Sequence, residues 1–173
     1  ALKNTVVFVL VAVVLNICIS TFLAVLIKSL RKKGERSFFR GWMFLPAVVP
    51  IVAVCYVWLI MFDPANGVLN QALMALGMDH PINWLNDPRT ALFSIVLVTL
   101  WCDLGYNLVI LMSGLDNIPN MFLEAAEIDG ANSIQKFFKI TLPLMSRNML
   151  FVVIMTCISY FQVFAQVLLP QFF

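Results

Sequence analysis

The sequence predicts an all-α membrane protein, folded as a polytopic helical bundle, on three observations. Hydrophobic residues make up 62% of the 173 residues and charged residues 12%, whereas soluble domains hold about 45–50% and about 25%. The mean hydropathy of +0.95 points the same way. The apolar residues also gather in four stretches, each near the ~20 residues that a helix needs to cross a bilayer. These figures exclude a soluble globular domain, a disordered chain and a disulfide scaffold.

Taken in order, the four stretches cover residues 4–27, 41–62, 91–112 and 148–169. Backbone polar groups in lipid must be satisfied within the segment, so each stretch is expected to be a helix. Pro46 and Pro50 lie in the second stretch, and each removes a backbone donor, so we expect a kink there. The kink is either a packing feature or part of a cavity wall. Because the chain begins with Ala1 and ends in apolar residues, we expect a fragment of a longer protein.

The charges between the stretches predict the orientation of the helices. Residues 28–40 hold six basic residues and one acidic residue, whereas residues 63–90 hold three acidic residues and one basic residue. Cytoplasmic loops carry an excess of Lys and Arg, so the first loop is expected inside and the second outside. By parity, residues 116–146 lie inside as well. In the outer loop, apolar residues at helical spacing over 68–76 predict a short interfacial helix, either a packed connector or a contact for an extracytoplasmic partner.

The sequence contains no catalytic or metal-binding constellation. His80 is the only histidine, so an H-E-x-x-H pair is excluded. The four cysteines fall one in each apolar stretch, without a C-x-x-C pair, and are expected to be small buried hydrophobes. No glycine is followed by the Lys-Ser or Lys-Thr of a phosphate-binding loop. We therefore expect no enzyme activity, no metal and no other cofactor. The basic residues beside the membrane would meet anionic lipid heads, and nothing indicates nucleic-acid binding.

Residues 116–146 predict a helix, a turn and a second helix lying against the inner membrane face. Pro119 suits the first turn of a helix, and Gly130 permits the left-handed backbone that ends one. Asn132 or Ser133 can cap the second helix. The first helix combines an apolar face with an acidic face, and such a surface is suited to a groove of a soluble partner.

The same segment resembles the EAA signature of permease subunits of ABC importers that are served by an extracytoplasmic binding protein. Glu124-Ala125-Ala126, Gly130 and Ile140-Thr141-Leu142-Pro143 stand at the spacing of that signature. Further stretches are similar to the carbohydrate-uptake branch, of the maltose and glycerol-3-phosphate permease type and first-subunit-like. These stretches are Phe38-Phe39-Arg40, Leu45-Pro46, Phe62-Asp63-Pro64, Asn83-Trp84, Gly105-Tyr106-Asn107 and Phe161-Gln162-Val163-Phe164. Residues 166–173 depart from the family pattern.

The resemblance implies a bundle of the ABC importer permease type, with four spans of a six-helix core visible in residues 1–173. Residues 116–146 would be the coupling segment, which seats in a cleft of the ATPase subunit. The positions that match its motif are Glu124, Ala125, Ala126 and Gly130. The implied protein is a multi-pass permease of the prokaryotic inner membrane. Its implied partners are a second permease subunit, ATP-binding subunits and an extracytoplasmic solute-binding protein. Its implied cargo is a sugar or a glycerol phosphate derivative.

Polar residues inside the third and fourth stretches are the candidates for the substrate pathway. An aspartate at the centre of a spanning helix costs about 2.5–3.5 kcal/mol on insertion scales, and Asp103 lies midway along the third stretch. The candidates are Asp103, Asn107, Ser159, Tyr160 and Gln162. Such groups recognise sugars through hydrogen bonds and aromatic faces. They can instead hydrogen-bond between helices and hold the bundle together, as expected for Asn16 in the first stretch.

The residues were also compared with what two other classes of membrane protein require. An ion channel, or another helical membrane transporter, would need a charged or carbonyl-rich filter, for which Asp103 is the one candidate. An intramembrane protease would need a histidine or a pair of aspartates within the spans, and the four stretches hold neither.

Overall fold

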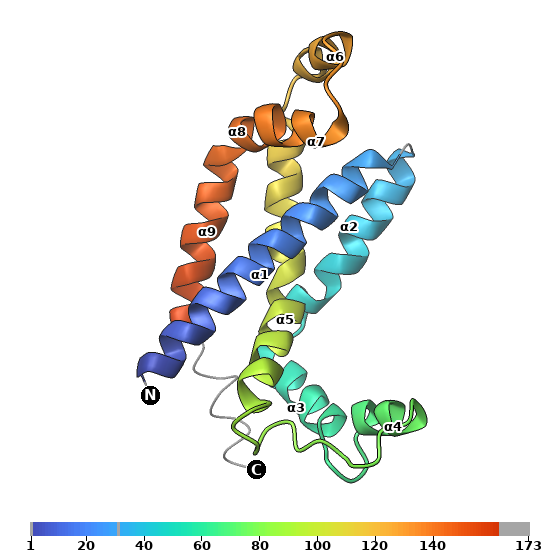
Figure 1. Cartoon of the computed structure of the whole chain (residues 1–173), viewed down its shortest axis with the longest axis vertical. Helices are drawn as coiled ribbons and strands as arrows, with labels where there is room; N and C mark the ends of the chain where they lie inside the picture. The colour runs from blue at the N-terminus through green and yellow to red at the C-terminus, as the bar shows by residue number, and fades with distance from the viewer. Residues whose placement is uncertain (1, 31, 163–173) are drawn as a thin grey trace.

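The computed structural model describes residues 2–30 and 32–162, and every regular element in these ranges is helical (Figure 1). The elements are α1 (Leu2–Ser29), α2 (Lys33–Val48), α3 (Ile51–Met61), α4 (Val68–Ala75), α5 (Ala91–Asp116), α6 (Asn120–Ile128), α7 (Ser133–Lys136), the π-helical turn η1 (Phe137–Thr141), α8 (Leu142–Leu144) and α9 (Ser146–Phe161). Two parts of the sequence-based expectation lie outside the described residues. These are the end of the fourth stretch at 163–169 and the departing tail at 166–173.

Two helices, α1 and α5, are long and apolar enough to cross a membrane without interruption. They contain 28 and 26 residues. The sequence predicted both of them. α5 begins at the predicted Ala91 but runs four residues further than predicted, to Asp116, so it reaches directly into the segment expected to lie inside.

The second predicted stretch is a broken pair of helices. α2 and α3 meet at 93° across Val49 and Pro50, so the expected kink is confirmed. The break lies at Pro50, which precedes the first residue of α3, whereas α2 continues through Pro46. Proline has no N–H to donate, and it also disfavours helical backbone in the residue before it. The bend therefore falls at the second proline of the pair.

The fourth predicted stretch also follows a bend. The segment Ser133–Leu144 and α9 meet at 71°, after the π-helical turn η1 and Pro143. Prolines and π-turns are the usual causes of sharp helix bends. By length and composition the described residues therefore hold two uninterrupted spans, or up to four if each bent pair is one span.

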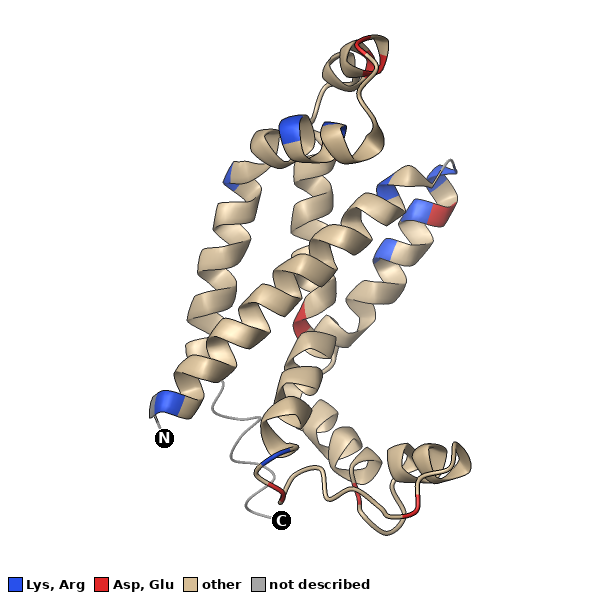
Figure 2. Cartoon of the chain, viewed as in Figure 1, with Lys and Arg blue, Asp and Glu red and all other residues tan. Residues whose placement is uncertain are grey.

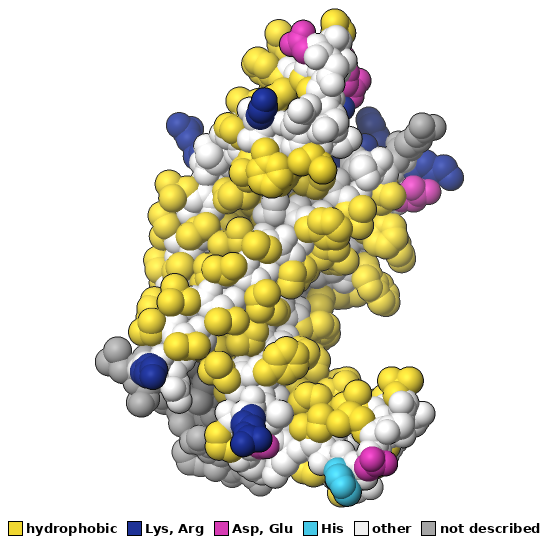
Figure 3. All heavy atoms as spheres, viewed as in Figure 1, with side chains coloured by type: hydrophobic (Ala, Val, Ile, Leu, Met, Phe, Trp, Pro, Cys, Tyr) yellow, Lys and Arg dark blue, Asp and Glu magenta, His cyan; other side chains and the backbone are white. Residues whose placement is uncertain are grey.

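Helix α5 is the centre of the bundle and packs against α1, α2 and α9. Its buried residues belong to three apolar clusters, which it shares with the surrounding helices. Gly105 lies where α5 meets α2, and a Cβ atom at this position would collide with the backbone of Met43 and Phe44. The outward faces carry exposed apolar side chains over most of the length of the bundle, as Figure 3 shows. Such a surface suits lipid rather than water.

Charged residues gather at the two ends of the bundle (Figure 2). The turn between α1 and α2 and the segment α6–α8 lie at one end, which we call the basic end, and α4 lies at the other (Figure 1). The short helix predicted over residues 68–76 is confirmed as α4, whereas its interfacial position stays a prediction. Its Asn70 is buried and accepts hydrogen bonds from the Ile82 amide, at 3.1 Å, and from Trp84 Nε1, at 3.0 Å. One amide side chain thereby joins α4 to residues 82–84 of the loop that leads to α5.

Candidate functional site

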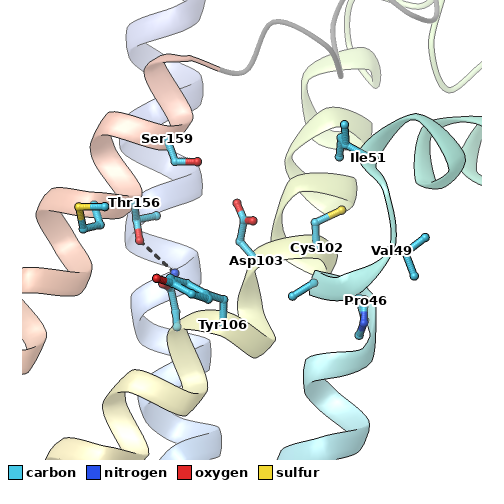
Figure 4. A pocket seen from close by; sticks show the side chains of 11 residues that line it. Pro46, Val49, Ile51, Cys102, Asp103, Tyr106, Thr156 and Ser159 are labelled. Carbon is cyan, nitrogen blue, oxygen red and sulfur yellow. Dashed lines mark hydrogen bonds between the residues drawn. The ribbon is translucent and has the colours of Figure 1, made fainter.

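A cavity of about 380 Å³ opens at mid-length of the bundle, between α5, α9 and the break that separates α2 from α3 (Figure 4). Its lining residues are Pro46, Ala47, Val49, Ile51, Cys102, Asp103, Tyr106, Asn107, Met155, Thr156 and Ser159. The broken helix thus supplies one wall, which is one of the two roles that the sequence left open for the kink at the two prolines.

The carboxylate of Asp103 points into this cavity from α5 (Figure 4). The side chain is partly buried, and no hydrogen bond or ion pair joins it to another residue within 2–30 and 32–162. Ser159 faces the same space from α9, and Tyr106 extends toward it from the next turn of α5. The cavity therefore presents an acceptor, a hydroxyl and an aromatic ring to whatever enters it.

Asn107 belongs to a hydrogen-bond network that joins α1, α5 and α9. Its Nδ2 donates to Asn16 Oδ1 at 2.7 Å and to Thr156 Oγ1 at 3.0 Å. Asn16 Nδ2 in turn donates to the Tyr160 hydroxyl at 2.9 Å. All four side chains are buried. Because an amide nitrogen has two hydrogens, Asn107 has used its donor capacity within the protein.

The structure brings together three of the five residues predicted for the substrate pathway, Asp103, Asn107 and Ser159. Tyr160 is held in the network with Asn16 and does not line the cavity, and the exposed Gln162 lies just beyond the end of α9. Sequence reasoning did not find Met155 or Ile51. Met155 stands one helical turn before Ser159, so the spacing could have indicated it. Ile51 follows the bend between α2 and α3, and no local sequence pattern predicts the angle of that bend.

At the basic end, α6 stands away from the bundle above α7 and α8 (Figure 1). Glu124 and Ala125 are exposed, whereas Ala126 is 8% exposed and faces the protein. The acidic side of α6 is tied to α7 by the ion pair between Glu127 and Lys136, at 2.6 Å. The surface left for a partner therefore centres on Glu124 and Ala125, with exposed apolar neighbours such as Ile128.

The turn that follows α6 has the predicted backbone. Gly130 has φ +76°, in the left-handed region that favours glycine. Of the two expected caps, the structure selects Asn132: its side chain accepts from the Gln135 amide at 2.8 Å, and the Gln135 side chain accepts from the Asn132 amide at 3.0 Å. This reciprocal capping box holds the entry to α7.

Two contacts join the basic stretch of residues 28–40 to the end of α5, where the segment 116–146 begins. Arg40 forms an ion pair with Asp116 at 2.9 Å, and Lys28 Nζ donates to the Leu115 carbonyl. The coupling candidate therefore lies at the same end as the loop with the strongest positive charge. This arrangement agrees with the expectation from parity that the two segments lie on the same side of the membrane, and which side that is stays a prediction.

No three His, Cys, Asp or Glu residues come close enough to hold a metal ion within the part of the chain that the structure describes. The chemistry available to the described residues is therefore hydrogen bonding and charge in the cavity, and protein contact at α6.

Comparison with known proteins gives one family match and several relatives. The family described as "binding-protein-dependent transport system inner membrane component" matches residues 17–171. The probable ABC transporter permease protein YesP of Bacillus subtilis is 37% identical over 165 residues, covering 95% of this chain and 52% of YesP. The lactose transport system permease protein LacF of Rhizobium radiobacter is 36% identical over 170 residues, covering 96% of this chain and 56% of LacF. The chain spans about half the length of the curated relatives it matches.

A solved structure shares the fold. The crystal structure of a bacterial ABC transporter involved in the import of the acidic polysaccharide alginate matches with a TM-score of 0.85 and 23% identity, over 94% of this chain and 57% of that chain. The predicted all-α bundle of the importer permease type is thereby confirmed at the level of the fold.

Proposed function

This chain belongs to the family of binding-protein-dependent transport system inner membrane components, and from that premise we propose that it is the membrane-spanning permease subunit of an ATP-driven importer. The proposed cargo is a sugar or a glycerol phosphate derivative. Its proposed partners are a second permease subunit, two ATP-binding subunits and an extracytoplasmic solute-binding protein. LacF, whose name states lactose transport, supports a sugar, and the resemblance of the sequence also admits a glycerol phosphate.

The observation that carries the proposal is the exposed helix α6 at the basic end. It presents Glu124 and Ala125 beside exposed apolar side chains, and Gly130, two residues after its end, has the left-handed backbone that turns the chain into α7. A small side chain permits close approach, and a carboxylate offers charge to a basic partner. We assign to α6 the docking of the ATP-binding subunit, with Glu124, Ala125, Ala126 and Gly130 as the coupling positions.

The position of α6 in the chain also connects the proposed docking segment to the cavity. α6 follows α5, which carries Asp103, and it leads through α7 and α8 into α9, which carries Ser159. The two helices that flank the docking segment are therefore two walls of the cavity. When the ATP-binding subunits close, displacement of α6 would move these walls together and open the cavity first to one side of the membrane and then to the other.

Co-purification tests the docking role of α6. Ala125→Arg in the full-length protein places a long cation on the exposed face of α6, and it should abolish recovery of the ATP-binding subunit with the permease. Ala75→Arg is the matched control, because Ala75 is also an exposed helical alanine but lies in α4 at the opposite end. Equal recovery from the two variants would overturn the assignment, and ion conductance by the purified chain alone would favour a channel.

A further inference from the structure

We propose that the cavity at Asp103 takes an uncharged saccharide and rejects anionic cargo such as a glycerol phosphate. The reason is that the described residues of the cavity wall include a carboxylate and no cation. The inference rests on the proposed function and reduces its two cargo classes to one.

The charge on the described cavity wall is negative. Among the described residues that line the cavity, Asp103 is acidic and none is Lys, Arg or His. The described basic residues lie toward the ends of the bundle (Figure 2), and Arg40, on the helix that supplies one wall, is paired with Asp116. An anion entering the cavity would therefore meet like charge and no counter-charge from this subunit.

The hydrogen-bonding groups in the cavity match a sugar better than a phosphate. An ionised carboxylate only accepts hydrogen bonds, and so do the oxygens of a phosphate dianion. Sugar hydroxyls donate, so they can pair with the Asp103 carboxylate directly. Tyr106, which is 47% exposed, offers a ring to the apolar face of a sugar. Asn107 has no amide hydrogen left for an anion, because both are bonded to Asn16 and Thr156.

A purely structural role for Asp103 does not fit its surroundings. The neighbouring buried groups Asn16, Asn107 and Tyr160 all make bonds between helices, whereas the Asp103 carboxylate has no such partner within 2–30 and 32–162. An acidic side chain in a spanning helix is costly when unpaired. Its orientation into the cavity (Figure 4) indicates that its partner is the cargo.

The sign of the cavity charge can be measured with thiol reagents. Ser159→Cys would be introduced into a cysteine-free full-length permease, assembled with its partner subunits in proteoliposomes. It would then be treated near neutral pH with a cationic and with an anionic methanethiosulfonate of similar size. We expect the cationic reagent to react faster by about tenfold or more. Asp103→Asn should remove the preference, and Asp103→Glu should keep it.

Ser133→Cys, at the start of the distant helix α7, is the matched control, and its reagent preference should not respond to Asp103→Asn. A preference at position 159 that is absent, reversed or unchanged by Asp103→Asn would overturn the proposal.

Uptake separates this inference from the proposed function. The complete importer with its own binding protein would be offered labelled neutral mono-, di- and oligosaccharides and sn-glycerol 3-phosphate. ATP-dependent uptake of a neutral saccharide without the phosphate supports the inference. ATP-dependent uptake of the phosphate without any saccharide keeps the proposed function and overturns the inference. Absence of any ATP-dependent uptake counts against the proposed function, and the reagent preference at position 159 then still decides the charge of the cavity.

Discussion

The Arg40 guanidinium of α2 donates to the Asp116 carboxylate at the end of α5, with 2.9 Å between Nη2 and Oδ2. This bond joins the basic stretch of residues 28–40 to the first residue of the proposed coupling segment, across 76 positions of sequence. The two segments, whose common side of the membrane was expected from parity, therefore lie at the same end of the bundle. The ion pair is half-exposed, so it contributes little to the stability of the fold. It is informative because it shows that the two segments lie at the same end of the bundle.

The first prediction concerns that topology. Single cysteines replacing Ser133 in α7 and Ala75 in α4, both exposed, should react with a membrane-impermeant maleimide from opposite sides. In a cysteine-free background, position 133 should be labelled in inside-out vesicles and position 75 in right-side-out vesicles, because the basic end faces the cytoplasm. Labelling of both positions from one side would contradict the arrangement of α4 and α6.

The second prediction concerns the contact of α5 with α2. Gly105→Ala places a Cβ atom against the backbone of Met43 and Phe44, and backbone yields less readily than a side chain. We expect a loss of about 1–3 kcal/mol in stability, measured as a lower thermal midpoint of the purified permease.

Gly41→Ala is the control for this substitution. Gly41 lies inside α2 with no neighbouring atom within 4 Å of the added Cβ, so alanine should leave the stability unchanged or raise it by up to about 1 kcal/mol, and the thermal midpoint should not fall. Equal effects at the two positions would show that α5 and α2 are not in close contact.

The third prediction concerns the network in the bundle. Asn16→Leu removes the bonds to Asn107 and Tyr160. Interhelical hydrogen bonds in membranes contribute about 0.6 kcal/mol on average and up to about 1.7 kcal/mol, so the free energy of unfolding should fall by about 1–3 kcal/mol. Unfolding in mixed micelles with increasing SDS measures it. Asn4→Leu, at an exposed position of the same helix, should have no such cost; a larger effect at Asn4 would refute the network.

The sequence predicted both ends of α1 within two residues and the start of α5 at Ala91, because the change from polar to apolar residues is a local signal, whereas α5 ends four residues later than predicted. It also predicted that Asn16 bonds between helices, but not with which partners. Those partners lie 91 and 144 positions away, and their approach depends on how three helices pack. Pro50 predicted a bend but not its 93°, since the angle is set by the packing of α3 against α5.

The proposed coupling segment also contains one feature that the sequence predicted and one that it did not. Gly130 was predictable because few other residues adopt its backbone conformation. Ala126 was expected on the docking surface beside Ala125, yet it faces the protein. The turn at Gly130 folds Ala131 back, so that the Ala131 amide bonds to the Ala126 carbonyl at 2.9 Å. Which of two adjacent alanines remains exposed follows from that fold and not from the motif.

The fourth prediction concerns this turn. At φ +76°, a side chain with a Cβ atom costs roughly 1–2 kcal/mol, and asparagine tolerates the conformation better than valine does. We expect ATP-dependent uptake to fall in the order Gly130, Gly130→Asn, Gly130→Val, with membrane insertion unchanged. The same two substitutions at Gly34, an exposed helical position with open space around it, should have similar and small effects. An uptake rate that Gly130→Val leaves intact would remove the turn from the coupling path.

We propose α6 as the contact for the ATP-binding subunit, and crosslinking from its exposed face probes that contact. A photo-reactive amino acid at position 125 of the full-length permease, illuminated in membranes that contain all subunits, should form an adduct with the ATP-binding subunit. The same residue at position 75 should form none. An adduct of position 125 with the extracytoplasmic binding protein or with lipid alone, or an ATP-binding-subunit adduct from position 75, would contradict the account.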